Sequence, residues 1–374
     1  MLVQLLACGL ATLAGASPPL TARGIITPRN LTLSWEMLPT GSQQQFRGLS
    51  AVSDRVAWVS GTGATVLRTV DGGASWESVG PPGLTGDADA DAELQFRDVQ
   101  AFSADRAVIL SIGPGAESRV YVTADGGKSW RRTFTNDEPT AFYNCMDFED
   151  NDNDGDGDDD DNSGARGFAV SDPVDGKFRL IETGDGGRSW TVVDPSGMAP
   201  ALEGEFGFAA SGTCISTAAG RWYLATGGVD PGRVLRSADG RRGWEASGSG
   251  VGGGGSAGVF SVRFRDAVHG IATGGDFNAA NGSARTAAWS EDGGETWTAS
   301  EMFPGGYRSG VAWAPGLCGG VAVAVGPSGS DVTLDGGRTW RTFDTGSFDS
   351  VECLAGRVCW ASGSRGRVAK LRLG

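Results

Sequence analysis

Short apolar runs with β-strand character recur along the chain, and a fixed polar stretch separates the last two runs of each group. Thr65–Thr69 comes before the first such stretch, and Trp76–Val79 follows it. Two further runs, Phe46–Val52 and Val56–Gly61, lie upstream. Short apolar runs bounded by Gly, Asp and Ser predict antiparallel strands joined by tight turns. Beyond the first residues the sequence has no helical periodicity.

The polar stretch is a motif, Ser/Thr-x-Asp-x-Gly-x-x-Trp, that occurs six times at intervals of 43 to 60 residues. Self-similarity at such a period indicates one supersecondary unit repeated several times. The fourth copy is degenerate, because Arg241 stands where the other copies have their second Gly. The Asp and Trp residues of the six copies are Asp71 and Trp76, Asp125 and Trp130, Asp185 and Trp190, Asp239 and Trp244, Asp292 and Trp297, and Asp335 and Trp340.

Each residue type in the motif suits a β-hairpin. Gly supplies the positive φ that a tight turn needs, and an Asp carboxylate can accept hydrogen bonds from the N–H groups of the turn. The Trp ring can cover the hairpin and bury apolar area. A catalytic role for the Asp is the alternative, but turn chemistry explains all six copies at once. We therefore interpret the motif as structural.

The motif resembles the Asp-box (BNR) repeat of sialidase-like β-propellers, and the resemblance covers nearly the whole mature chain. In that family each blade is a four-stranded antiparallel sheet, and the box joins its third and fourth strands. The resemblance therefore implies an all-β propeller. The first strands of six blades would open at Phe46, Phe96, Phe142, Glu205, Val259 and Tyr307.

Three strand-like runs remain after the sixth motif: Phe348–Leu354, Val358–Gly363 and Arg367–Leu373. They would form a blade without its last strand, which the N-terminal run Leu31–Leu38 can supply, with Trp35 in the place of the motif Trp. Closing the ring in this way removes an unpaired sheet edge. The sequence thus predicts seven blades, closed by the N-terminal strand.

The N-terminus suggests a targeting segment. Residues 1–16 are short and apolar and end in the small-x-small pattern Ala14-Gly-Ala16, which is typical of a signal-peptide cleavage site; a disordered apolar tail is the alternative. We expect residues 17–30 to be a leader and residues 31–374 to be a single propeller domain. No apolar run is long enough to span a bilayer. The expected location is extracytoplasmic: secreted, periplasmic or in a thylakoid lumen.

The cysteines are compatible with export. Cys8 would leave with the signal segment, so five remain. Cys353 and Cys359 fall on adjacent predicted strands of one hairpin, and Cys145 and Cys214 fall on inner strands of neighbouring blades. Either pair could form a disulfide if the geometry allows, and buried free thiols are the equal alternative.

An acidic insert at 149–165 carries much of the negative charge. Nine of the thirteen residues 149–161 are acidic, while the whole chain has a formal net charge of −14. We expect a solvated loop between the first two strands of blade three. It also matches the ligand spacing of an EF-hand calcium loop, although such a match can arise by accident in any Asp/Gly-rich run. The candidate calcium ligands are Asp150, Asp152, Asp154, Asp156, Asp158 and Asp161.

The sequence offers little support for catalysis. It has one histidine, His269, and no nucleophile-elbow stretch or phosphate-binding loop with a Lys. A carbohydrate-active hydrolase of the sialidase-like type is the alternative function that we retain. Sialidases use an arginine triad that binds the substrate carboxylate, a Tyr nucleophile paired with a Glu, and an Asp that acts as the acid. Only four Tyr are present here, and the Arg-Ile-Pro motif of sialidase domains is absent. We predict no catalytic residue and no cofactor other than the possible calcium.

Several residues at the starts of innermost strands are candidates for a binding site at the channel rim. Guanidinium groups there would suit an anionic ligand or partner, and salt bridges to acids such as Asp98 and Glu205 are the alternative. The candidates are Arg47, Arg97, Tyr143, Glu205, Tyr307 and Arg308.

A closer resemblance is to the photosystem II assembly/stability factor propellers and their bacterial relatives. Four runs carry it: Phe96–Val99, Thr123–Trp130, Tyr307–Trp313 and Val325–Asp331. The resemblance implies a non-catalytic, extracytoplasmic protein that docks membrane-protein precursors, with a basic patch on one face of the ring. The acidic insert is not part of that family's pattern. We expect a monomer with a protein partner, and the net charge argues against nucleic-acid binding.

Overall fold

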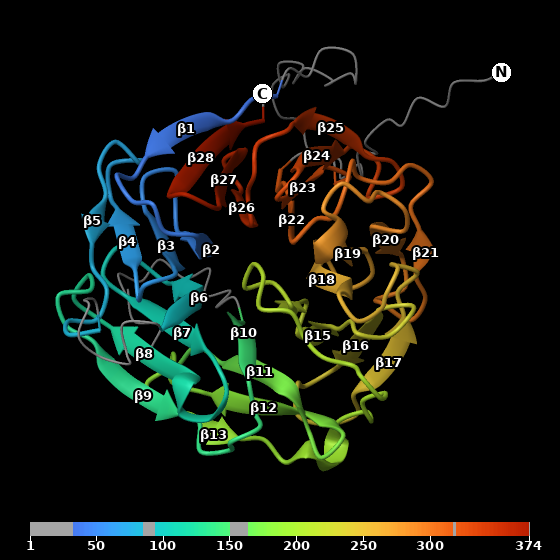
Figure 1. Ribbon diagram of the computed structural model, residues 1–374, viewed down its shortest axis with the longest axis horizontal. Helices are drawn as coiled ribbons and strands as arrows, with labels where there is room; N and C mark the ends of the chain where they lie inside the picture. The colour runs from blue at the N-terminus through green and yellow to red at the C-terminus, as the bar shows by residue number, and fades with distance from the viewer. Residues whose placement is uncertain (1–32, 85–93, 150–163, 317–318, 374) are drawn as a thin grey trace, which may run out of the picture.

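Seven four-stranded antiparallel sheets stand around a central axis in the computed structural model, as Figure 1 shows. The structure describes residues 33–84, 94–149, 164–316 and 319–373. The predicted signal and leader segments and the six candidate calcium ligands lie outside these ranges. The predicted seven-bladed, all-β propeller is therefore confirmed. None of the helices in the described residues is long and apolar enough to cross a membrane.

The strands of the first three blades follow the chain in order, from the hub outward. They are β2 (Phe46–Ala51), β3 (Ala57–Gly61), β4 (Val66–Thr69) and β5 (Glu77–Ser78); β6 (Gln95–Ala101), β7 (Ala107–Ile112), β8 (Arg119–Thr123) and β9 (Arg131–Thr135); and β10 (Tyr143–Phe148), β11 (Gly167–Val174), β12 (Lys177–Thr183) and β13 (Thr191–Val192). Short 3-10 turns occur at η2 (Gly115–Glu117) and η3 (Pro195–Gly197).

Blades four to six repeat the pattern, and a further 3-10 turn, η4 (Phe277–Ala279), lies in blade five. The strands are β14 (Ile215–Ala218), β15 (Arg221–Ala225), β16 (Arg233–Ser237) and β17 (Glu245–Gly248); β18 (Ala257–Phe264), β19 (Gly270–Asp276), β20 (Ala287–Ser290) and β21 (Thr298–Ala299); and β22 (Gly310–Trp313), β23 (Ala322–Gly326), β24 (Gly329–Thr333) and β25 (Arg341–Asp344).

The seventh blade closes the ring as predicted. The N-terminal strand β1 (Glu36–Pro39) pairs with β28 (Arg367–Arg372), beside β27 (Val358–Ser362) and β26 (Ser350–Leu354). The Trp35 ring lies just before β1 and packs in the apolar cluster between the sixth and seventh blades. The chain ends thus share one sheet, which Figure 1 shows in blue and red.

One predicted strand is wrong. The run from Glu205 to Ala210 does not open blade four, because it forms no strand beyond an isolated bridge from Phe206 to Gly227. The first strand of that blade begins at Ile215. The alternating apolar residues of this run serve another purpose, described below. Blade six likewise starts later than expected, at Gly310.

The motif turns have the geometry that their residue types suggest. In the second blade, the Asp125 carboxylate accepts hydrogen bonds from the Thr123 hydroxyl at 2.9 Å and from the N–H of Ser129 at 2.9 Å. The Gly127 N–H donates to Thr123 Oγ1 at 3.0 Å. The same bonds recur in every copy except the fourth, where the N–H groups of Arg241 and Arg242 donate to the Asp carboxylate instead.

The motif turns join third and fourth strands, so their aspartates are spread around the outer part of the ring. The strand directions also define two faces. The front face holds the starts of the first strands, including Arg47 and Arg97. The back face holds the motif turns and the two ends of the acidic insert that the structure describes, at Glu149 and Gly164.

Backbone groups of the innermost strands are satisfied across blade boundaries. The Asp98 carboxylate accepts from the Met146 N–H of the next blade at 2.6 Å, and Asp147 accepts from Thr217 at 2.9 Å. Between other neighbouring blades the pairs are Ser50 with Ala101, Ser261 with Val311 and Glu352 with Ala51. These contacts hold adjacent blades together at the hub.

Both predicted cysteine pairs are disulfides, so the alternative of free thiols does not apply to them. Cys353–Cys359 lies within one hairpin, and Cys145–Cys214 joins β10 of blade three to the residue before β14. The second bond closes a sequence separation of 69 residues. A long loop of this kind restricts the unfolded chain strongly.

The second motif Gly provides a test of the turn. Gly127 has φ +83°, and a Cβ there would lie 2.6 Å from both Cβ and the carbonyl oxygen of Val79. Gly83 has φ +82° but open space around it. We expect Gly83→Ala to cost about 1 kcal/mol through backbone strain alone. Gly127→Ala should cost about 1–3 kcal/mol more, because it also forces neighbouring atoms apart. Equal losses in urea unfolding would contradict this account of the turn.

Candidate functional site

The segment Glu205–Thr213, which we call the hub segment, runs into the centre of the ring. In Figure 1 it is the yellow-green loop near the axis. Its Ala209 carbonyl accepts hydrogen bonds from Arg97 Nη1 at 3.1 Å and from Arg47 Nη1 at 3.5 Å. These donors belong to the first two blades, on the other side of the axis from the blade that follows the segment. The hub segment therefore occupies the front part of the central channel.

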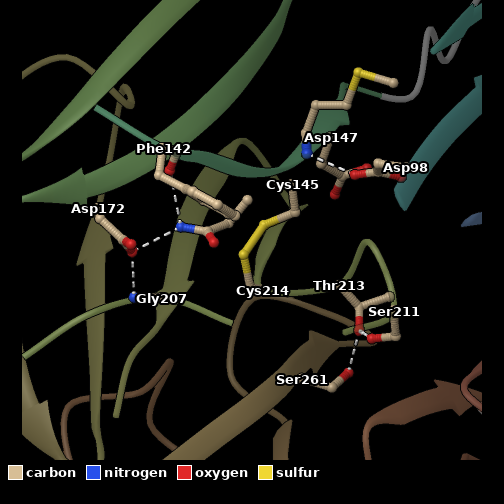
Figure 2. Close-up of a disulfide and its surroundings, with 12 residues drawn as sticks. Asp98, Phe142, Cys145, Asp147, Asp172, Gly207, Ser211, Thr213, Cys214 and Ser261 are labelled. Atoms are coloured by element: carbon tan, nitrogen blue, oxygen red, sulfur yellow. Dashed lines mark hydrogen bonds between the residues drawn. A yellow bond between two sulfur atoms is a disulfide. The ribbon is translucent and has the colours of Figure 1, made fainter. Parts of the chain in front are cut away.

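Further bonds tie the hub segment to the remaining blades. Figure 2 shows the Gly207 N–H donating to Asp172 at 2.9 Å and the Thr213 hydroxyl donating to Ser261 at 2.7 Å. The Ser211 hydroxyl donates to the Ser309 carbonyl at 2.7 Å. Its carbonyl accepts from Ser350 in the last blade. Blades one, two, three, five, six and seven thus all contact this one stretch.

Aromatic side chains fix the start of the hub segment. Phe208 stacks on Phe260, with ring centroids 3.6 Å apart, and Tyr307 meets Phe260 edge-on. Room for Phe208 depends on Gly227, where an added Cβ would lie 2.3 Å from the Phe208 ring. This apolar cluster explains why the run carries alternating Phe residues although it is not a strand.

Each end of the hub segment is anchored. At the start, the Glu205 carboxylate is fully buried and forms a salt bridge with Arg233. It also accepts from the Leu202 N–H at 2.8 Å. At the other end, Cys214 is bonded to Cys145, as Figure 2 shows.

At the front of the channel, five polar residues form what we call the arginine cluster: Gln45, Arg47, Gln95, Arg97 and Asp349. Arg97 donates to the Gln95 side chain through Nε at 3.0 Å and Nη2 at 2.7 Å. The Gln45 amide donates to Asp349 at 2.9 Å. Two guanidinium groups and one carboxylate therefore lie together at the front of the channel. Arg47 and Arg97 are each only partly exposed.

Burial and charge shift the pKa values in the arginine cluster. Burial lowers the pKa of Arg97 to about 10, with a further lowering from the neighbouring Arg47 and an opposing effect of Asp349. Burial raises the pKa of Asp349, while Arg47, Gln45 and Arg97 favour its ionised form. The Arg47 Nε is buried without a hydrogen-bond partner in the described part of the chain. The cluster is thus a partly desolvated cationic site.

The six predicted rim residues do not form one site. Arg47 and Arg97 lie together, but Arg308 is completely buried in a salt bridge with Asp331. Tyr143 packs between the second and third blades, where its ring meets Phe134 edge-on. It does not line the rim.

Tyr307 and Glu205 also serve the hub interior, through the aromatic cluster and the salt bridge with Arg233. The alternative, that the rim arginines form salt bridges with neighbouring acids, holds for Arg308, whose partner is Asp331. Arg97 instead bonds to the neutral Gln95 side chain and the Ala209 carbonyl.

Sequence reasoning missed Gln45, Gln95 and Asp349, and it missed the hub segment itself. The spacing gave one signal that could have found the segment. The interval from the third motif to the first strand of blade four is long, and it contains the Phe206-Gly-Phe-Ala-Ala run with a cysteine shortly after it. An inner strand needs no such extra length.

The arrangement gives little basis for hydrolysis. The rim candidate Glu205 has both carboxylate oxygens occupied, by Thr226, Arg233 and the Leu202 N–H. His269 lies on the back face, hydrogen-bonded to Asp266 at 2.8 Å. Among the described residues, no group of three or more His, Cys, Asp or Glu side chains is placed to hold a metal ion.

No protein-family model matches the sequence, and no curated protein matches it. The fold is similar to solved propellers. YCF48 bound to D1 peptide aligns with a TM-score of 0.59 and 14% identity over 94% of this chain and 100% of that chain. YCF48 from Cyanidioschyzon merolae aligns with a TM-score of 0.58 and 17% identity over 90% of this chain and 98% of that chain. The WD40 propeller domain of Doa1 aligns with a TM-score of 0.56 and 12% identity over 91% of this chain and 98% of that chain. At these identities the likeness shows the fold alone.

The pKa of Asp349 predicts how a substitution depends on pH. Because burial raises this pKa above the ordinary value of 3.8, the native state binds the proton more tightly than the unfolded state. The contribution of Asp349 to the free energy of unfolding is therefore largest below pH 3.8 and decreases as the pH rises through the pKa of the folded state. Asn cannot ionise, so the free energy of unfolding of Asp349→Asn relative to wild type should increase between about pH 4 and pH 7.

Denaturant titrations at several pH values measure this difference. Asp137→Asn, at a side chain that is 90% exposed, is the control and should show no comparable trend. A difference for Asp349→Asn that falls with rising pH would contradict the assignment.

Proposed function

We propose that this protein is a non-catalytic, exported propeller that binds a segment of a protein partner at the arginine cluster. The observation that carries the proposal is the convergence of Arg47 and Arg97 on one neutral carbonyl at the front of the channel. Guanidinium groups bind carboxylates more strongly than neutral oxygens, and they do so with defined geometry. An acidic side chain or a terminal carboxylate of the partner is therefore the chemistry that suits this opening.

The similarity to YCF48 bound to D1 peptide supports a protein-binding role for the same fold. By analogy, we propose that the partner is a membrane protein during its assembly and that the chain acts as a monomeric platform. The relation to Asp-box repeat proteins is part of this proposal, and the repeated hydrogen bonds of the motif turns support it.

The arginine cluster can be tested by site-specific crosslinking. A photoreactive amino acid at Gln95 should crosslink a membrane protein in the native membrane fraction, while the same residue at Thr135, on the outer strand β9, should not. Mass spectrometry would give the crosslinked segment, and its affinity can be measured with a synthetic peptide. Arg47→Gln together with Arg97→Gln should weaken this binding about tenfold or more.

The matched control is Arg132→Gln, at an exposed arginine on β9. Combined with Arg131→Gln at the neighbouring exposed arginine of β9, it removes the same two charges far from the hub and should leave the affinity unchanged. Equal effects of the two sets of substitutions would refute the arginine cluster as the binding site.

Export makes a separate prediction about the N-terminus. If residues 1–16 are a signal segment, the mature protein should begin after Ala16. Mass spectrometry of the protein from its native source measures this directly. An intact Met1 would refute export by this route without affecting the binding proposal.

A further inference from the structure

The hub segment occupies the donors that a partner would need. The acceptor that it offers them is the Ala209 carbonyl, a neutral oxygen, and the Arg47 contact is long at 3.5 Å. Hydrogen bonds from a guanidinium to a neutral oxygen are weaker than those to a carboxylate. The Arg47 Nε is also unpartnered in the described part of the chain, and the other acceptor of Arg97 is the neutral Gln95 side chain. Both cations therefore donate to neutral oxygens, which an anion can outcompete.

The hub segment is fixed at its ends and irregular between them. Glu205 is held by Arg233, and Cys214 is held by the disulfide. Residues 207–213 belong to no strand or helix. Gly204 and Gly212, close to the two anchors, have φ +78° and +69°. The stretch can therefore change its path between fixed points without breaking a sheet.

We propose that the hub segment is an autoinhibitory strap. In the structure described here, it blocks the arginine cluster, and an anionic group of the partner displaces the Ala209 carbonyl to bind. This inference rests on the proposed function, because it describes how access to that same site is regulated. The Cys145–Cys214 bond sets the length of the strap and so limits how easily it moves.

Specific contacts hold the strap closed. The Phe208 ring is buried against Phe260, and the Ser211 hydroxyl bonds to the Ser309 carbonyl at 2.7 Å. A ligand shifts such an equilibrium only by as much as it prefers the open form. The carboxylate–guanidinium contact supplies that preference, since it forms only when the carbonyl has left.

The test measures strap opening without any partner. In the variant Cys145→Ala with Cys214→Ala, one anchor is lost. Amide hydrogen exchange in residues 207–212 should rise about tenfold or more, and phenylglyoxal should modify Arg97 faster by a similar factor. Exchange in β19 should stay as in wild type, because the blades remain folded. The matched control is Cys353→Ala with Cys359→Ala, which removes the disulfide within one hairpin.

Unchanged exchange and labelling in the first variant, or equal changes in the control, would overturn the proposal. If the first variant does not fold, Ser211→Ala takes its place, because it deletes one closing bond and leaves both anchors. Amide exchange in residues 207–212 and labelling of Arg97 should then increase by a smaller factor. If neither increases in this variant, the proposal is also overturned. Since no partner is used, an opening strap with no binding at the arginine cluster would refute the proposed function alone.

Discussion

The innermost strand of every blade is a sheet edge, and this constraint organises the molecule. On the side toward the central axis, its N–H and C=O groups have no neighbouring strand to bond to. Buried backbone groups need hydrogen-bond partners, so other groups must supply them. The chain meets the requirement with side chains from adjacent blades, such as Asp98 bonding to the Met146 N–H. Pairing of β1 with β28 completes the seventh sheet and closes the ring.

The hub segment extends the same solution to the centre of the channel. It brings backbone groups of residues 207–211 to positions where Asp172, Arg97 and Ser350 bond to them. A disulfide beside β14 fixes the point at which the chain turns back into a blade. The centre of the ring is thus filled by the protein's own chain, and the front of the ring around Arg47 and Arg97 is the recognition site that we propose.

The repeated parts of this fold were predictable from sequence because each repeat solves the same local problem. The Asp, Gly and Trp of the motif, such as Asp125, Gly127 and Trp130, predict a turn in each copy. Trp35 identified the N-terminal run as the strand that completes the last blade. The hub was not predictable, because its residues meet only in space. Phe206 and Phe208 look like alternate positions of a strand, yet Phe208 stacks on Phe260 of blade five and Phe206 forms only a single bridge to Gly227, between β15 and β16. Arg308 looks equivalent to Arg97 until Asp331 is seen beside it.

Fold similarity does not choose among functions here, since YCF48 and WD40 propellers align about equally well. The choice depends on which charged groups remain incompletely partnered at the hub. Arg308 has a buried carboxylate, Arg233 has Glu205, and Arg263 has Asp147 at 3.2 Å. Arg47 and Arg97 instead share a neutral carbonyl beside a carboxyl group whose ionisation burial disfavours. Because an anion gains most where cations are least satisfied, this opening is where a partner's charge would alter the balance of contacts that the ring has already made.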